Sequence, residues 1–239
     1  MSTPGVAVRA TRAYTGVKLV VVVLAACGGS SPPAAPPAPT AAAHHDHNGG
    51  GMHHGFKNAE DWAKVFDDPA RDAWQQPDRI VAELALTPTM TVADIGAGTG
   101  YFAVRIARAV PQGQVIATDL EPDMIRYLEQ RAQREGLTNI RAVVTPADDP
   151  QLAAGSVDRI LVADVWHHVD GRVDYARKLA AALRPGGTIT IVDFKLDATR
   201  GPPAKFRLAP ASVIAELEAV GLVAKVAFEL ADQYVITAR

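Results

Sequence analysis

The chain has 239 residues, 48% of them hydrophobic, and carries a formal net charge of −2. That length suits one sizeable α/β domain with additional segments, but hardly two full domains. A single cysteine excludes an internal disulfide. The sequence also has no concentrated lysine and arginine face of the kind that binds a phosphate backbone, which disfavours a nucleic-acid substrate.

Residues 1–26 have the pattern of a signal peptide. Three basic residues and no acid precede or enter the apolar run from Leu19 to Ala26, which is too short to span a bilayer. The run ends at Leu24-Ala25-Ala26-Cys27, which resembles the bacterial lipobox, where cleavage precedes a lipid-bearing cysteine. We expect Cys27 to be lipidated and to anchor the protein in the cell envelope, facing the periplasm; the alternative is a chance cysteine. Loss of the leader would change the net charge from −2 to about −5.

Residues 27–55 are predicted to form a Pro/Ala-rich tether followed by a histidine-rich segment. Gly28 to Thr40 contains mainly Gly, Ser, Pro and Ala, which is typical of a linker. Five of the seven histidines then follow, at His44, His45, His47, His53 and His54. Imidazoles this dense could bind zinc, copper or nickel, whereas the intervening glycines favour a solvated, pH-sensitive linker. The sequence therefore defines no firm metal site.

Residues 56–90 are predicted to be a helical segment ahead of the main domain. Trp62 and Phe66 lie four residues apart and should share one helix face. A further helix is predicted over Ile80 to Leu86, ending near Thr87-Pro88.

The stretch from Val92 to Phe102 combines a short apolar strand with a glycine-rich turn, and helical spacing follows it through Val110. Glycine backbone lets a ligand approach closely, and the next helix offers free N–H groups at its N-terminus. A dinucleotide fingerprint would have a glycine where this chain has Tyr101. Instead the turn, which begins at Asp94, reads Asp-x-Gly-x-Gly-x-Gly and resembles motif I of class I S-adenosylmethionine-dependent methyltransferases.

Alternating strands and helices are predicted for the rest of the chain. The ranges are strand 114–119, helix 122–135, strand 140–144, a strand and its exit within 157–169, helix 172–183, a stop at 184–187, strand 188–194, loop 195–208, helix 210–220, and a hairpin of 222–230 and 233–237. Asp119 ends the second strand 19 residues after Gly100, where its carboxylate could accept hydrogen bonds from ribose hydroxyls. Its alternative role is an N-cap of the helix that begins near Pro122.

The methyltransferase resemblance covers most of Thr91 to Phe194 and is strengthened by Leu-Arg-Pro-Gly-Gly before the fifth strand. It implies a seven-stranded, mostly parallel, doubly wound α/β sheet with a C-terminal antiparallel hairpin over residues 91–239. It also implies S-adenosyl-L-methionine as the cofactor. The residues matched to the cofactor site are Asp94, Gly96, Ala97, Gly98, Gly100, Asp119, Leu120, Asp148, Asp164 and Val165, with Asp149 as an alternative to Asp148 beside the adenine.

In that family the leading segment often folds over the cofactor and substrate. This makes Trp74 and Gln75, together with Tyr101, candidates for the substrate pocket, with plain packing as the alternative for the aromatic side chains of the segment.

Asp164 through His168 should face the reacting methyl group, because the carboxyl ends of parallel strands form the ligand crevice. These residues resemble a motif of quinone-biosynthesis and related small-molecule methyltransferases that carries two histidines. Either His167 or His168 could act as a base, or one of them could pack or cap the next helix. The sequence therefore predicts methyl transfer to a small-molecule acceptor by a membrane-anchored lipoprotein, of undetermined oligomeric state. The alternatives are a non-catalytic lipoprotein that binds S-adenosylmethionine or a similar ligand, and a metal-binding lipoprotein.

Overall fold

The structure is a computed structural model that describes residue 55 and residues 58–239. The predicted signal peptide, Cys27, the tether and the histidine run lie outside the described residues, so these expectations stay predictions. Within the described part of the chain, no helix is both long enough and apolar enough to cross a membrane.

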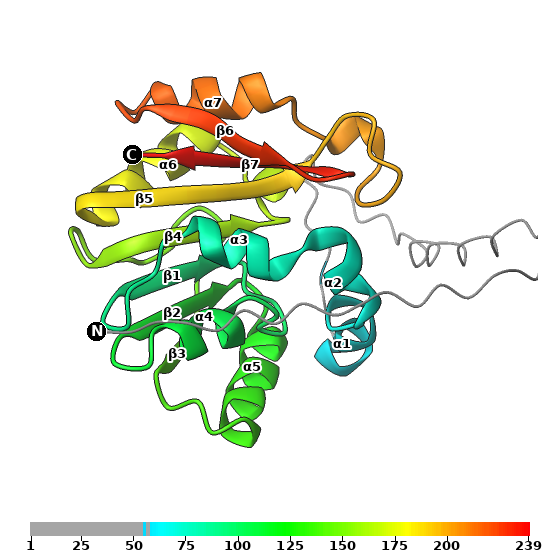
Figure 1. The fold of residues 1–239 in the computed structure, drawn as a ribbon, viewed down its shortest axis with the longest axis vertical. Helices are drawn as coiled ribbons and strands as arrows, with labels where there is room; N and C mark the ends of the chain where they lie inside the picture. The colour runs from blue at the N-terminus through cyan, green and yellow to red at the C-terminus, as the bar shows by residue number, and fades with distance from the viewer. Residues whose placement is uncertain (1–54, 56–57) are drawn as a thin grey trace, which may run out of the picture. The chain divides into compact units, whose positions relative to one another are not determined.

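One mixed sheet forms the centre of the described region (Figure 1). Its strands are β1 (Thr91–Ile95), β2 (Gln114–Asp119), β3 (Ile140–Val144), β4 (Val157–Ala163), β5 (Leu183–Phe194), β6 (Ala224–Glu229) and β7 (Gln233–Ala238). The strand order is β3-β2-β1-β4-β5-β7-β6. The pairs among β1 to β5 are parallel, whereas β7 is antiparallel to both β5 and β6. The predicted fold class is therefore confirmed.

Helices pack on both faces of this sheet. The face helices are α3 (Pro77–Glu83), α4 (Ala103–Ala109) and α5 (Pro122–Arg134) on one side and α6 (Arg172–Ala182) and α7 (Pro210–Glu218) on the other. The remaining helical elements of the described region are α1 (Ala59–Phe66), α2 (Ala70–Gln75) and the 3-10 turns η1 (Trp166–His168) and η2 (Ala204–Phe206). Alternate residues along a strand point to opposite faces. Along β4, for example, Ile160 joins the core under α6 and α7, whereas Leu161 joins the core under α3, α4 and α5.

Several predicted boundaries differ from those of the structure. The helix expected over 80–86 begins at Pro77, because proline suits a first helical turn, and it ends before Ala85, whose φ is +47°. The helix expected over 210–220 ends at Glu218. Strand β5 begins at Leu183 rather than at residue 188, so residues 184–187, predicted as a stop, belong to the strand. The pairing register between β4 and β5 shifts at this place, and Gly186 has a φ of +79°.

The carboxyl ends of the parallel strands lie at one edge of the sheet, and α1 and α2 lie beyond that edge (Figure 1). The loop after β5, which contains η2, lies at the same end. The glycine-rich turn after β1 and the histidines after β4 also belong to this end, so these two groups of predicted site residues lie at the same end of the sheet.

Candidate functional site

The glycine-rich turn after β1 needs glycine for two separate reasons. Gly96, Gly98 and Gly100 all have positive φ, at +66°, +54° and +88°, a region that residues with a Cβ rarely adopt. A Cβ on Gly96 would lie 2.4 Å from the Val165 side chain, and a Cβ on Gly100 would lie 2.2 Å from Leu128. Val165 therefore packs directly on the turn, and Gly100 serves close packing against α5. Gly98 is different, because a Cβ there would meet only Phe66, at 3.6 Å.

Asp119 fixes the turn to the end of β2. Its Oδ2 accepts a hydrogen bond from the Gly98 N–H at 2.8 Å, and its Oδ1 accepts one from the Glu121 N–H at 2.9 Å. Burial raises the pKa of this carboxyl group, and the two N–H donors oppose that shift. The N-cap position of α5 is Glu121 and no side chain caps it, so the alternative N-cap role of Asp119 is not observed. The apolar Leu120 beside it is 43% exposed.

Asp94 lies near the end of β1, in a setting that disfavours its ionised form. Its side chain is buried, and Oδ2 has no hydrogen-bond partner among the described residues. Burial, with a smaller contribution from the Asp119 charge, raises the pKa of Asp94 to about 7. The Ala103 N–H and the Arg71 charge oppose that rise.

Asp164, the residue after β4, accepts hydrogen bonds from three side chains that come from distant parts of the chain. Its φ is +62°, a conformation that aspartate tolerates better than most residues. Oδ2 accepts hydrogen bonds from Arg71 and Gln75 at 2.9 Å each, and Oδ1 accepts one from Gln233 at the start of β7. Asp164 thereby ties α2 and β7 to the end of β4.

The segment α1–α2 covers the glycine-rich turn. Trp62 and Phe66 share a helix face as predicted and stack with ring centroids 5.3 Å apart. Asp67, just after α1, accepts hydrogen bonds from Arg131 at 2.7 Å and from the Thr99 hydroxyl at 3.1 Å. The contacts that hold this segment over the turn are therefore strongly polar.

The three predicted substrate residues have different surroundings. The Trp74 ring lies 6.2 Å from the Phe194 ring, and the Arg200 guanidinium lies 5.0 Å from its centroid. Gln75 is fully buried and is held by Asp164. Tyr101 is 4% exposed, and its hydroxyl donates a hydrogen bond to Asp72 of α2, so the tyrosine fastens the covering segment to the turn.

The two histidines of η1 have different surroundings in the structure. The His167 side chain is 3% exposed, and its Nδ1 lies 2.8 Å from Oδ1 of Asp193, an acid near the end of β5. The backbone N–H of His167 also donates to Oδ2 of the same acid, at 3.1 Å. The His168 ring lies 4.2 Å from the His167 ring, between centroids. Asp193 was missed from the sequence, although its place at the end of the strand next to β4 is a usable signal.

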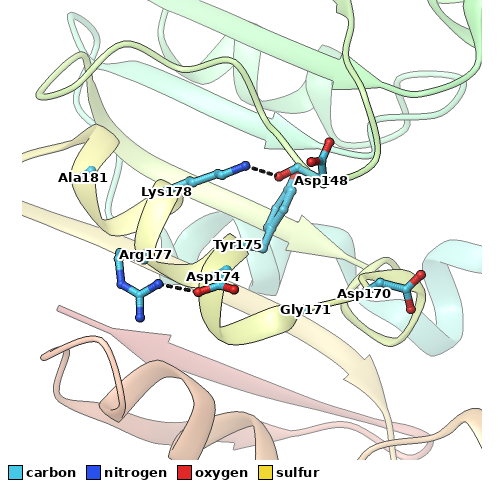
Figure 2. Close-up of a pocket in the computed structure, with 8 residues that line it drawn as sticks. All are labelled: Asp148, Asp170, Gly171, Asp174, Tyr175, Arg177, Lys178 and Ala181. Carbon is cyan, nitrogen blue, oxygen red and sulfur yellow. Dashed lines mark hydrogen bonds and ion pairs between the residues drawn. The ribbon is translucent and has the colours of Figure 1, made fainter.

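Asp148 contacts α6 in the structure. It is exposed and lines a hollow of about 580 Å³ against α6, together with Tyr175 and Lys178 (Figure 2). The Lys178 ammonium donates to the Asp148 backbone oxygen at 2.6 Å, and it lies 3.9 Å from the Asp149 carboxylate. None of the residues that line this hollow comes from the glycine-rich turn. The adenine role of Asp148 or Asp149 thus stays a prediction.

Comparisons with known proteins agree with this geometry. A family model described as "Methyltransferase domain" matches residues 92–187. A solved S-adenosylmethionine-dependent methyltransferase from Aquifex aeolicus superposes with a TM-score of 0.70 at 25% identity, covering 74% of this chain and 96% of that one. The described region has the methyltransferase fold.

Curated relatives match less than half of this chain. "Methyltransferase gedG" of Aspergillus terreus is 32% identical over 117 residues, which is 49% of this chain and 33% of the relative. An uncharacterized methyltransferase of Mycobacterium bovis is 37% identical over 102 residues, 42% of this chain and 38% of the relative. The chain thus spans 33–38% of the length of these relatives.

The matching family model and the solved structures imply S-adenosylmethionine as the cofactor of a domain with this fold, and the residues present fit it. Asp94 Oδ2 and Gln233 Oε1 are buried acceptors without partners among the described residues. An ammonium group brings three donors and would satisfy such acceptors. By contrast, no group of three or more His, Cys, Asp or Glu side chains suited to a metal ion occurs in the described part of the chain.

Proposed function

We propose that this protein transfers the methyl group of S-adenosylmethionine to a small-molecule acceptor. The observation that carries the proposal is the charge at the carboxyl ends of β1, β2 and β4. Asp94, Asp119 and Asp164 lie there, and Arg71 pairs with one of them. When all three acids are ionised, the group has two more negative charges than positive ones.

This charge favours a cationic ligand over an anionic one. S-adenosylmethionine has a sulfonium and an ammonium but only one carboxylate. A nucleoside di- or triphosphate, or a dinucleotide, would place its phosphates against three largely buried acids, where like charges repel strongly. Tyr101 in place of the third fingerprint glycine argues in the same direction.

The bound cofactor supplies a methyl group already activated by the sulfonium, so this chain's residues mainly hold the reactants in line. The turn from Gly96 to Gly100 provides backbone that a ligand can approach, and Asp119 keeps that turn at the end of β2. The segment α1–α2 limits the access of water to the turn.

His167 is the candidate base. With Nδ1–H donated to Asp193, the lone pair of the neutral imidazole resides on Nε2, and the carboxylate stabilises the ring once it takes up a proton. The acceptor that suits this pair has a hydroxyl, amine or acidic C–H group that loses a proton as the methyl group arrives. General-base assistance of this kind contributes roughly 100-fold to 10,000-fold in rate.

We also propose that the domain is held on a membrane through Cys27. The support is the sequence Leu24-Ala25-Ala26-Cys27 after a basic and apolar leader. Expression of the full chain and of Cys27→Ala in a bacterium tests this part alone. We expect the full chain in the membrane fraction and the variant outside it; equal fractionation of both would contradict lipid anchoring.

The experiment for the activity uses cofactor with a tritiated methyl group and the small-molecule fraction of a bacterial extract as the acceptor pool. We expect label to enter small molecules with the full chain. With His167→Gln the transfer should fall at least 100-fold while cofactor affinity changes less than threefold, because the base acts only on the acceptor. Equal transfer by both proteins would contradict the assignment of His167.

A further inference from the structure

Arg71 reaches from α2 into the centre of the acid group. Its side chain is 12% exposed, and one Nη donates to Asp164 at 2.9 Å. Its other Nη donates to the Phe66 carbonyl at 2.8 Å, and Nε donates to Gln75. The guanidinium also lies 4.0 Å from the centroid of the Tyr101 ring. Arg71 thus touches the covering segment, the glycine-rich turn and the end of β4 at once.

Two of the acids depend on this guanidinium for charge compensation. The Arg71 charge lowers the pKa of both Asp94 and Asp164, against the larger effect of burial, and the His167 ring adds a smaller contribution at Asp164. Asp119 is compensated by backbone N–H groups instead. Arg71 is therefore a permanently charged cation that pairs directly with Asp164 and also acts on Asp94.

The amino-acid part of the cofactor poses a problem at this place. Its ammonium suits the unpartnered oxygen of Asp94, but its carboxylate would be repelled by the same acids unless a cation lies nearby. A guanidinium has five N–H donors, and three of those of Arg71 are used by Gln75, Phe66 and Asp164. Two donors are left for a further acceptor, and a carboxylate is the acceptor that guanidinium binds most strongly.

We infer that Arg71 binds the carboxylate of the cofactor's methionine part, and that it thereby selects ligands with an intact amino-acid group. The inference rests on the proposed function, since it concerns the same site. Because Arg71 belongs to α2, the bound carboxylate also links the covering segment to the ligand. The segment is then held closed by the cofactor as well as by Asp164.

Calorimetric titration with two ligands tests the inference. S-adenosylmethionine and decarboxylated S-adenosylmethionine share the adenosine, sulfonium and amine, and differ in the carboxylate. Both are titrated into the full chain, Arg71→Met and Arg71→Lys. Arg79→Met is the matched control, because Arg79 lies on α3 with its guanidinium 4.0 Å from the Phe228 ring, away from the acids. Thermal unfolding of each variant verifies that it is folded.

The expected result is specific to the carboxylate. Arg71→Met should weaken S-adenosylmethionine binding by tenfold to a hundredfold more than it weakens binding of the decarboxylated ligand. Arg71→Lys should recover part of the loss, and Arg79→Met should bind both ligands as the unchanged chain does. If Arg71→Met weakened the binding of both ligands equally, the inference would be overturned. Arg71 would then serve only to hold α2 in place. No binding of either ligand by the unchanged chain would instead defeat the proposed function itself.

Discussion

Substitution of Asp94 by asparagine removes a charge from the site while nearly conserving its shape. Burial is the main reason that the pKa of Asp94 rises from 3.8 to about 7 in the folded chain. An acid with a raised folded-state pKa binds more protons in the folded than in the unfolded chain between those two values. The free energy of unfolding therefore falls as the pH rises through this window.

The magnitude follows from the width of the window. Each pH unit within this window lowers the free energy of unfolding by about 1.4 kcal/mol. From pH 5 to pH 8, the full chain should lose about 3 kcal/mol through Asp94, nearly all of it below pH 7. The Asp94→Asn variant has no charge to bury at this position. The free energy of unfolding of the variant minus that of the unsubstituted chain should therefore increase by that amount from pH 5 to pH 8. Constant effects of the amide on packing cancel in this comparison.

Urea unfolding of ligand-free full chain and Asp94→Asn at pH 5, 6, 7 and 8 measures the difference directly. The gap between the two free energies of unfolding should widen up to pH 7 and then stay level. A gap that is independent of pH, or one that narrows as the pH rises, would refute the reasoning about Asp94.

Two further predictions concern the turn and the histidine. Gly100→Ala should destabilise the fold by about 2–5 kcal/mol, because residue 100 has a φ of +88° and the new Cβ would lie 2.2 Å from Leu128. Gly98→Ala should cost only about 1–2 kcal/mol, because its Cβ would meet only Phe66, at 3.6 Å. Equal losses of stability for the two variants in thermal unfolding would contradict this packing argument. Nitrogen-15 NMR at pH 8 should find His167 with its proton on Nδ1, and Asp193→Asn should lower the population of that tautomer; an Nε2–H tautomer in the unchanged chain would contradict the proposed pair.

Much of the fold was predictable because each strand is a short apolar run with turn-forming residues on both sides. Strands β2 and β3 have the predicted bounds, and the C-terminal hairpin pairs as expected. The errors occur where local signals compete. Pro77 starts a helix three residues before the first clear apolar position, Ile80. Around Gly186 the turn residues fall within the bounds of a strand, which local patterns did not indicate.

The site was predictable only in its local part. The glycine-rich turn, Asp119 and the two histidines have a recognisable spacing, and the structure brings them to one end of the sheet. Arg71 was missed because 93 residues separate it from Asp164, and nothing in its local sequence distinguishes it from other arginines. Asp193 was missed for a similar reason, since it lies near the end of an apolar strand and its partner His167 belongs to η1, 26 residues earlier in the chain.

The measurement that tests the central claim most directly is calorimetric titration of the full chain with S-adenosylmethionine, beside Asp119→Ala. The unchanged chain should bind the cofactor, and Asp119→Ala should bind it at least tenfold more weakly, because the turn loses its fastening at Gly98 and the ligand loses a charged acceptor. No binding by a folded, unchanged chain would contradict the assignment of this site to S-adenosylmethionine.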